Sequence, residues 1–278
     1  MAENVLDFLF LDDLALAVQR GRVRGHNSLA ATRVERLGPL LELLVLEREG
    51  SLDGMAIDLL SCSSILQQLK RALLPRAVGT SITTITDNVR AGFIATSRDP
   101  NAEDHTLWVA FCREVQVAAE FAGLPKQTAQ GLVGALCEIE ENVHLHSQRA
   151  HDGLVGYRAT QEEFEFVVAD NGIGVLQSLR QSPRYGNLRD SGTAIKLALT
   201  DGESRLSHQK SGHGYGFHGL FVGLANLNGE LRFRSDDHSL TIDGTSPSLM
   251  AARLSQTVRL QGFVASIVCR AQPLPPLH

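Results

Sequence analysis

The feature that most constrains the fold is a long amphipathic segment, residues 126–147, followed by two apolar segments with strand character. Its apolar residues recur on one side of a helix. Residues 153–160 and 163–169 then have strand character and are joined by a tight polar turn, which is typical of two paired antiparallel strands. Because both the helix and the strands must bury an apolar face, the sequence predicts an α/β (α+β) sandwich with a helix packed on a sheet.

Composition limits the functional class. The chain has 278 residues, 43% of them hydrophobic, and a formal net charge of -5. This length allows one or two globular domains with a large core. Proteins that grip nucleic acid by neutralising phosphates are usually basic, so the acidic balance argues against a nucleic-acid partner.

The cysteines and the apolar runs indicate the compartment. The four cysteines are far apart and form no CxxC pair: Cys62, Cys112, Cys137 and Cys269. Neither a disulfide framework nor a structural zinc knuckle is expected, and a reducing cytoplasm is the predicted location. No apolar run is long enough to span a bilayer, and the acidic start of the chain is unlike a signal peptide.

A polar stretch, residues 97–104, contains Pro100 and lacks an apolar period, so a domain boundary is predicted there. It divides the chain into residues 1–104 and residues 105–278. In the first part, the sequence predicts a smaller α/β domain, with helices at 37–49 and 65–74 and strands at 55–60 and 81–86. In the second part, it predicts further helices at 108–121, 193–199 and 216–227, and further strands at 230–235 and 263–269.

Three motifs in the second part carry candidate chemistry. On the long helix, Glu138, Asn142 and His146 are four residues apart and share one face. The Asn142 carbonyl suits a hard cation such as Mg²⁺, and Glu138 could orient or deprotonate a water molecule. Taken alone, the stripe is more typical of a solvated polar face.

The second motif follows the strand at 163–169. Asp170 stands at the end of this apolar strand, and Gly172 and Gly174 allow the chain to turn where other residues resist. A carboxylate there can accept a hydrogen bond from an exocyclic amine, while the glycines let a flat ring approach the backbone. An ordinary Asp-Asn-Gly turn is the alternative.

The third motif places Gly212, Gly214 and Gly216 ahead of an apolar helix. Such a loop exposes backbone N–H groups toward phosphate oxygens. The loop is not a Walker motif, because no Gly-Lys-Ser/Thr follows. Each motif alone is compatible with a structural role, and the order of the three is more specific.

A helix with Glu138 and Asn142, a strand ending in Asp170-x-Gly172-x-Gly174, a polar loop and a Gly212-x-Gly214-x-Gly216 box together resemble the GHKL family of ATP-binding proteins. That family includes DNA gyrase, heat-shock chaperone ATPases, mismatch-repair proteins, sensor histidine kinases and anti-sigma serine kinases. The resemblance implies a Bergerat fold, a mixed sheet with helices on one face. The pattern from Asn142 to Ser147 is most similar to histidine-kinase-like and anti-sigma-like regulatory proteins.

The resemblance also implies roles for the matching residues. Glu138 matches the general base of the hydrolysing members, and Asn142 matches the Mg²⁺ ligand. Asp170 would accept the adenine amino group beside Gly172 and Gly174. The second glycine box (Gly212, Gly214 and Gly216) would line the triphosphate of ATP, and residues 181–211 would form the lid over the nucleotide.

The chain departs from the family pattern at several positions. Leu145 replaces a common Lys or Arg, and Phe263 replaces a Thr whose hydroxyl helps to hold adenine. Tyr215 and His218 crowd the second glycine box. In the first part, residues 55–64 are similar to STAS domains of anti-anti-sigma factors, which implies a regulatory protein partner.

The sequence is therefore compatible with three functions. The first is an ATP·Mg²⁺-dependent protein kinase or switch acting on a protein partner, and the second is a non-catalytic interaction module with a degenerate nucleotide site. The third is an ATPase that uses Glu138 as general base. A homodimer is compatible with the sequence. A zinc site built from the histidines (His144, His146, His151, His213 and His218) is disfavoured, since His144 and His146 face different ways on a helix.

Overall fold

The computed structural model describes residues 4–22, 32–48, 50, 52, 81–86, 88–96, 104–149, 153–199, 229–243 and 251–271. These residues form a mixture of helices with one six-stranded sheet and a two-stranded parallel pair. The large sheet has the order β3-β4-β5-β6-β8-β7. Its strands are β3 (Ser81–Ile85), β4 (Arg90–Thr96), β5 (Gly153–Ala159), β6 (Glu163–Asp170), β7 (Glu230–Ile242) and β8 (Arg253–Arg270). The small pair is β1 (Asn4–Val5) with β2 (Thr32–Arg33).

Every neighbouring pair in the large sheet is antiparallel. The α/β class predicted from the sequence is therefore confirmed, but within the described residues the sheet is antiparallel rather than mixed. Short polar turns explain part of this, because a tight turn such as the one between β5 and β6 can join only antiparallel strands.

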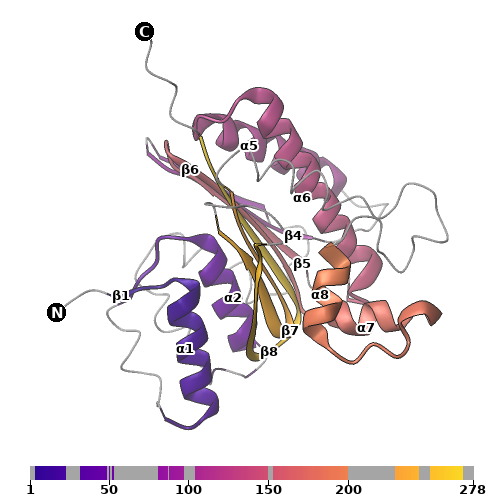
Figure 1. The fold of residues 1–278 in the computed structure, drawn as a ribbon. Coiled ribbons are helices and arrows are strands. Elements are labelled where there is room, and N and C mark those ends of the chain that lie inside the picture. The colour runs from indigo at the N-terminus through magenta and orange to yellow at the C-terminus, as the bar shows by residue number, and fades with distance from the viewer. Residues whose placement is uncertain are drawn as a thin grey trace.

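Helices cover both faces of the large sheet (Figure 1). One face carries α5 (Asp104–Phe121), α6 (Lys126–His146) and α8 (Ser191–Leu199), with α7 (Gly174–Arg180) packed beside α8. The other face carries α1 (Phe8–Gln19) and α2 (Leu37–Arg48). The helices of the second part thus share one face, as predicted, and helices from the first part cover the opposite face.

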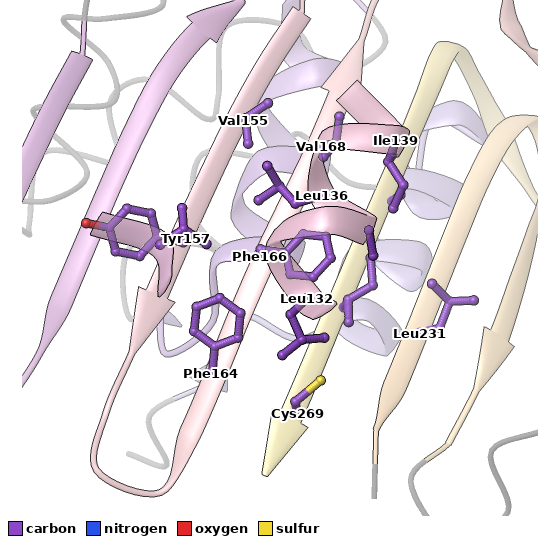
Figure 2. Close-up of a cluster of buried hydrophobic side chains, with 14 of the residues drawn as sticks. Leu132, Leu136, Ile139, Val155, Tyr157, Phe164, Phe166, Val168, Leu231 and Cys269 are labelled. Carbon is purple, nitrogen blue, oxygen red and sulfur yellow. The ribbon is translucent and has the colours of Figure 1, made fainter. Parts of the chain in front are cut away.

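Side-chain alternation along β6 separates the two cores. Phe164, Phe166 and Val168 point toward α5 and α6, while Val167 and Ala169 belong to the core beneath α1 and α2. Figure 2 shows the first set interleaved with Leu132, Leu136 and Ile139 of α6. Because β6 is buried on both sides, apolar residues from Phe166 to Ala169 form an uninterrupted run.

The sheet continues across the boundary predicted at residue 104. β4 lies before that position and pairs over seven residues with β5, which lies after it.

A short 3₁₀ helix, η4 (Pro183–Tyr185), precedes α8. The predicted elements at 55–60, 65–74 and 216–227, including the STAS-like stretch, lie outside the described residues.

The C-terminal hairpin is longer than the sequence predicted. Strands were expected at 230–235 and 263–269, whereas β7 and β8 extend to Ile242 and back to Arg253. A register irregularity at Asp236, which has a positive φ of 55°, separates the predicted part of the hairpin from the additional part. The additional part is half-exposed and polar, so it lacks the apolar run that marks a central strand.

A buried ionic network holds α1 and α2 against β7. Arg232 donates to both carboxylate oxygens of Glu42 at 2.9 Å and to Asp12 at 2.7 Å. Arg234 also donates to Glu42 and, at 2.5 Å, to the Val258 carbonyl. Glu42 is 0% exposed. Burial alone would raise the pKa of Glu42, but the charges and hydrogen bonds of the two arginines outweigh it and hold that pKa below its ordinary value.

A second buried carboxylate fixes the start of α2. The Leu37 and Gly38 N–H groups donate to the two oxygens of Glu165 at 2.7 Å each. These are N–H groups that a helix leaves without an internal partner, so a side chain of the central strand β6 serves as the helix cap. Burial raises the pKa of Glu165 to about 7, although the two N–H donors oppose the shift.

We expect Glu42→Gln to destabilise the protein by about 3 to 5 kcal/mol, because it leaves two buried arginines short of a counter-charge. Chemical denaturation at neutral pH measures this. The matched control is Glu35→Gln, which breaks the exposed pair with Arg33 and should change stability by no more than about 1 kcal/mol. Equal effects of both substitutions would contradict a structural role for the network.

The Glu165 cap predicts a specific pH dependence. Because the folded-state pKa is raised from 4.5 to about 7, the folded protein keeps a proton that the unfolded chain has released. Stability should therefore fall by about 1 to 3 kcal/mol as the pH rises between these values, and level off above. Denaturation midpoints of wild type and Glu165→Gln across pH 4 to 8 test it. The variant should lack this slope, and Glu35→Gln should retain it.

Candidate functional site

The end of α6 meets the turn that follows β6. Ile173 N–H donates to the Ser147 carbonyl at 3.0 Å, just beyond the last turn of α6. A Cβ added at Gly172 would lie 2.4 Å from the same carbonyl oxygen, closer than real Cβ atoms approach. Two of the three sequence motifs therefore adjoin in space, and Gly172 is required because the backbones touch.

Asp170 is the buried polar group of this junction. It is 3% exposed, and its Oδ1 accepts a hydrogen bond from Gly172 N–H at 2.6 Å. By the alternation of β6, its side chain falls on the same face as Phe166 and Val168, the face covered by α6. The structure thus places a carboxylate at the strand end and fixes it by the turn that follows.

The third side of the junction is the bend of β8. Gly262 has φ +81°, and a Cβ there would lie 2.0 Å from the Asp170 carbonyl oxygen. The Ser235 hydroxyl accepts from Val175 N–H at 3.0 Å and donates to the Gly262 carbonyl at 2.7 Å. Asp170, the start of α7 and two C-terminal strands are therefore joined through backbone groups, with Gly174 packed against Ser235 and Gly262.

Phe263 pairs in register with Asp170. Its ring is 7% exposed and stacks on Phe233 of β7, with centroids 5.5 Å apart and an interplanar angle of 6°. Both rings belong to the core under α5 and α6. The residue in register with Asp170 on β8 is therefore an aromatic side chain buried in the core.

Glu138 and Asn142 lie on the more open side of α6. Glu138 is exposed and lies about 14 Å from Ser147 along the helix axis. Asn142 is half-buried and lies about 8 Å from Ser147 along the same axis. His146 is also half-buried. Burial and then the charge of Glu141 raise the pKa of Glu138 above its ordinary value. A carboxylate with a raised pKa is a stronger base, which suits the role expected of Glu138.

Sequence reasoning missed a buried pair on the same helix. Glu140 is 4% exposed, and its carboxylate is hydrogen-bonded to Nε2 of His144. The two residues are four apart, a spacing visible in the sequence, but the neighbouring acids gave no sign that Glu140 is the one turned inward. The buried Nδ1 atom of His144 has no hydrogen-bond partner.

A second polar cluster ties α8 to β7. The Ser191 hydroxyl is hydrogen-bonded to Asp237 and lies 2.7 Å from Nδ1 of His238, while the same Nδ1 is 2.8 Å from Asp237. A hydrolytic triad needs the serine and the acid on different ring nitrogens, so this arrangement is an anchor rather than a nucleophile. Burial would raise the pKa of Asp237, but hydrogen bonds from Ser191 and His238 lower it to about 2.

The second glycine box, Gly212, Gly214 and Gly216, lies outside the described residues, as do Tyr215 and His218. Of the predicted lid, residues 181–199 are described and contain η4 and α8. Within the described parts of the chain, no group of three or more His, Cys, Asp or Glu side chains is placed to hold a metal ion.

Comparison with known proteins adds no family to this geometry. No protein-family model matches the chain, and a search of curated proteins gives no match. Among the helices described here, none has both the length and the apolar character needed to cross a bilayer.

We expect Gly172→Ala to destabilise the protein by about 1 to 3 kcal/mol, because the added Cβ forces the turn away from Ser147. Gly131→Ala is the matched control. Gly131 is an exposed position on α6 with nothing within 4 Å of an added Cβ, so its replacement should stabilise by about 0.5 to 1 kcal/mol. Opposite signs in thermal or chemical unfolding are expected, and a neutral Gly172→Ala would contradict the close junction.

Proposed function

We propose that this chain is an ATP·Mg²⁺-binding regulatory protein with a GHKL-type (Bergerat) nucleotide site, acting on a protein partner as a kinase or switch. In this proposal Asp170 receives the adenine amino group, Asn142 holds Mg²⁺, and the glycine box at 212–216 lines the phosphates. The antiparallel sheet with α5, α6 and α8 on one face is compatible with the proposal. It is also compatible with other α/β sandwiches, so the fold alone is not the argument.

The observation that carries the proposal is the convergence at Asp170. A buried carboxylate with one oxygen fixed by Gly172 N–H lies at a turn whose backbone touches the end of α6. A carboxylate at this strand end can accept a hydrogen bond from the exocyclic amine of adenine.

Asn142 supports the metal part of the proposal. It is half-buried and lies one and a half turns from the junction, on the same side of α6 as Glu138. An amide oxygen and phosphate oxygens are hard ligands, which Mg²⁺ prefers, and the ion would offset the repulsion among the phosphates. The role of Glu138 then distinguishes the possible activities of the protein. If Glu138 acts as a base toward water, the protein is an ATPase. If it does not, the phosphate is transferred to a partner or ATP is only bound.

Phe263 favours a second candidate, a protein-interaction module on the same scaffold with a degenerate nucleotide site. Its ring stands at the register position of Asp170 and stacks on Phe233. A core ring at this position supplies no hydroxyl to a bound base. In this alternative, Asp170 serves only to fix the turn between β6 and α7.

We expect the wild-type protein to bind ATP only with Mg²⁺ present, as measured by calorimetric titration. Asp170→Asn should weaken binding at least tenfold, because a carboxylate that accepts from the amine is replaced by a neutral amide. Asn142→Ala should weaken binding of Mg·ATP but leave any metal-free nucleotide binding unchanged. Glu138→Gln should leave affinity intact and abolish phosphate release if the protein hydrolyses ATP.

Asp236→Asn is the matched control, since it removes a carboxylate outside the junction at a positive-φ position that Asn tolerates. It should bind ATP like wild type. Equal affinities of wild type and Asp170→Asn would overturn the site assignment. Failure of the folded wild type to bind any adenine nucleotide would instead establish the interaction module as the better candidate.

A further inference from the structure

Two cysteines that are 25 residues apart in sequence meet between α5 and α6. The Sγ atoms of Cys112 on α5 and Cys137 on α6 are 3.7 Å apart. Both residues are half-buried, so a small reagent can reach them, whereas Cys269 of β8 is fully buried in the core (Figure 2). Neither the fold nor the proposed nucleotide site accounts for this thiol contact.

The two sulfurs lie close to bonding distance. A disulfide needs a sulfur–sulfur distance of about 2.05 Å, so the pair must close by about 1.7 Å. Rotation about χ1 moves a cysteine sulfur by more than this without moving the backbone. The helices are consecutive and joined by a short turn at 122–125, which holds the two positions opposite each other.

We propose that Cys112 and Cys137 form a reversible dithiol–disulfide site whose co-reactant is a low-molecular-weight disulfide such as oxidised glutathione. One cysteine thiolate attacks the glutathione disulfide, forms a mixed disulfide and releases one glutathione. The second cysteine attacks the protein sulfur of that bond and releases the second glutathione. Two protein thiols are oxidised, one glutathione disulfide is reduced, and the two cysteine protons end on the two glutathione thiols.

The surroundings set the rate of this exchange. Glu140, buried one turn after Cys137, places a carboxylate near the thiols. The hydrogen bond with Cys137, then burial, then the negative charge of Glu140 raise the pKa of Cys112 above its ordinary value. Only the thiolate attacks, so the exchange is slow at neutral pH and accelerates as the pH rises. Such a pair follows a sustained oxidising potential rather than a brief pulse of peroxide.

The bond would act on the helix that carries Asn142. It would close a loop of 25 residues spanning the turn between α5 and α6, which restricts the unfolded chain more than the folded one. The oxidised protein should therefore keep α6 in place to a higher temperature. This inference stands on the thiols alone and does not depend on nucleotide binding.

The test uses the full chain incubated with oxidised glutathione at pH 8, followed by alkylation of the remaining thiols, proteolysis and mass spectrometry. We expect the loss of two hydrogen masses and a peptide that links Cys112 to Cys137, both reversed by dithiothreitol. The melting temperature should rise by about 5 °C on oxidation. The rate of oxidation should increase about tenfold between pH 7 and pH 8.

Cys112→Ser and Cys137→Ser are the matched variants. Each should carry a single glutathione on the remaining partner and show no rise in melting temperature, because no second thiol completes the exchange. Cys269→Ala should still form the link. Stable glutathione adducts on both cysteines of the wild type, unmodified thiols after prolonged incubation, or a link from Cys62 to either residue would overturn the proposal.

Discussion

The structure depends on the alternation of the β6 side chains between the two faces of the large sheet. Phe164 and Phe166 pack under α5 and α6, while Glu165 between them turns the other way and caps α2. A shift of one residue in the pairing of β6 would place the carboxylate among aromatic rings and leave the start of α2 without acceptors. The central strand therefore fixes the positions of both helical layers together.

The same alternation determines what the candidate site contains. Asp170 ends β6 on the α6 face, and Phe263 of β8 stands opposite it in register. The turn after Asp170 must pass against Ser147, which only glycine at 172 permits. The position of the carboxylate thus follows from sheet register, and its surroundings follow from the close approach of two backbones.

The sequence predicted those elements whose signals are local. The period of α6 and the tight polar turn between β5 and β6 gave bounds within one residue of the structure, and α5 begins earlier than expected, at Asp104. The chain from 90 to 96 was not predicted as a strand, because a buried run of seven residues without polar alternation resembles other apolar segments. Similarly, nothing local indicated that the first part of the chain would complete the sheet of the second.

For the same reason, contacts between residues that are distant in the sequence could not be predicted. The contact between Ser191 and His238 and the one between Cys112 and Cys137 require a known fold, because neither spacing carries a signal. By contrast, Glu138, Asn142 and Asp170 could be proposed as site residues from the sequence, since three ordered motifs resemble one family pattern. The residues that a single sequence reveals are those whose spacing is fixed within one element or one motif.

The arginines of β7 indicate how an acidic chain of this kind would hold a phosphate-bearing ligand. Arg232 and Arg234 point to the face opposite α6, where Glu42 and Asp12 neutralise them. Moving either to the α6 face would require a register change along the whole strand, and would leave Glu42 buried without a counter-charge. The two guanidinium groups are therefore unavailable to a ligand beside Asp170. In the proposed site, backbone N–H groups and a metal ion held by Asn142 would offset phosphate charge instead, which is why we expect nucleotide binding to require Mg²⁺.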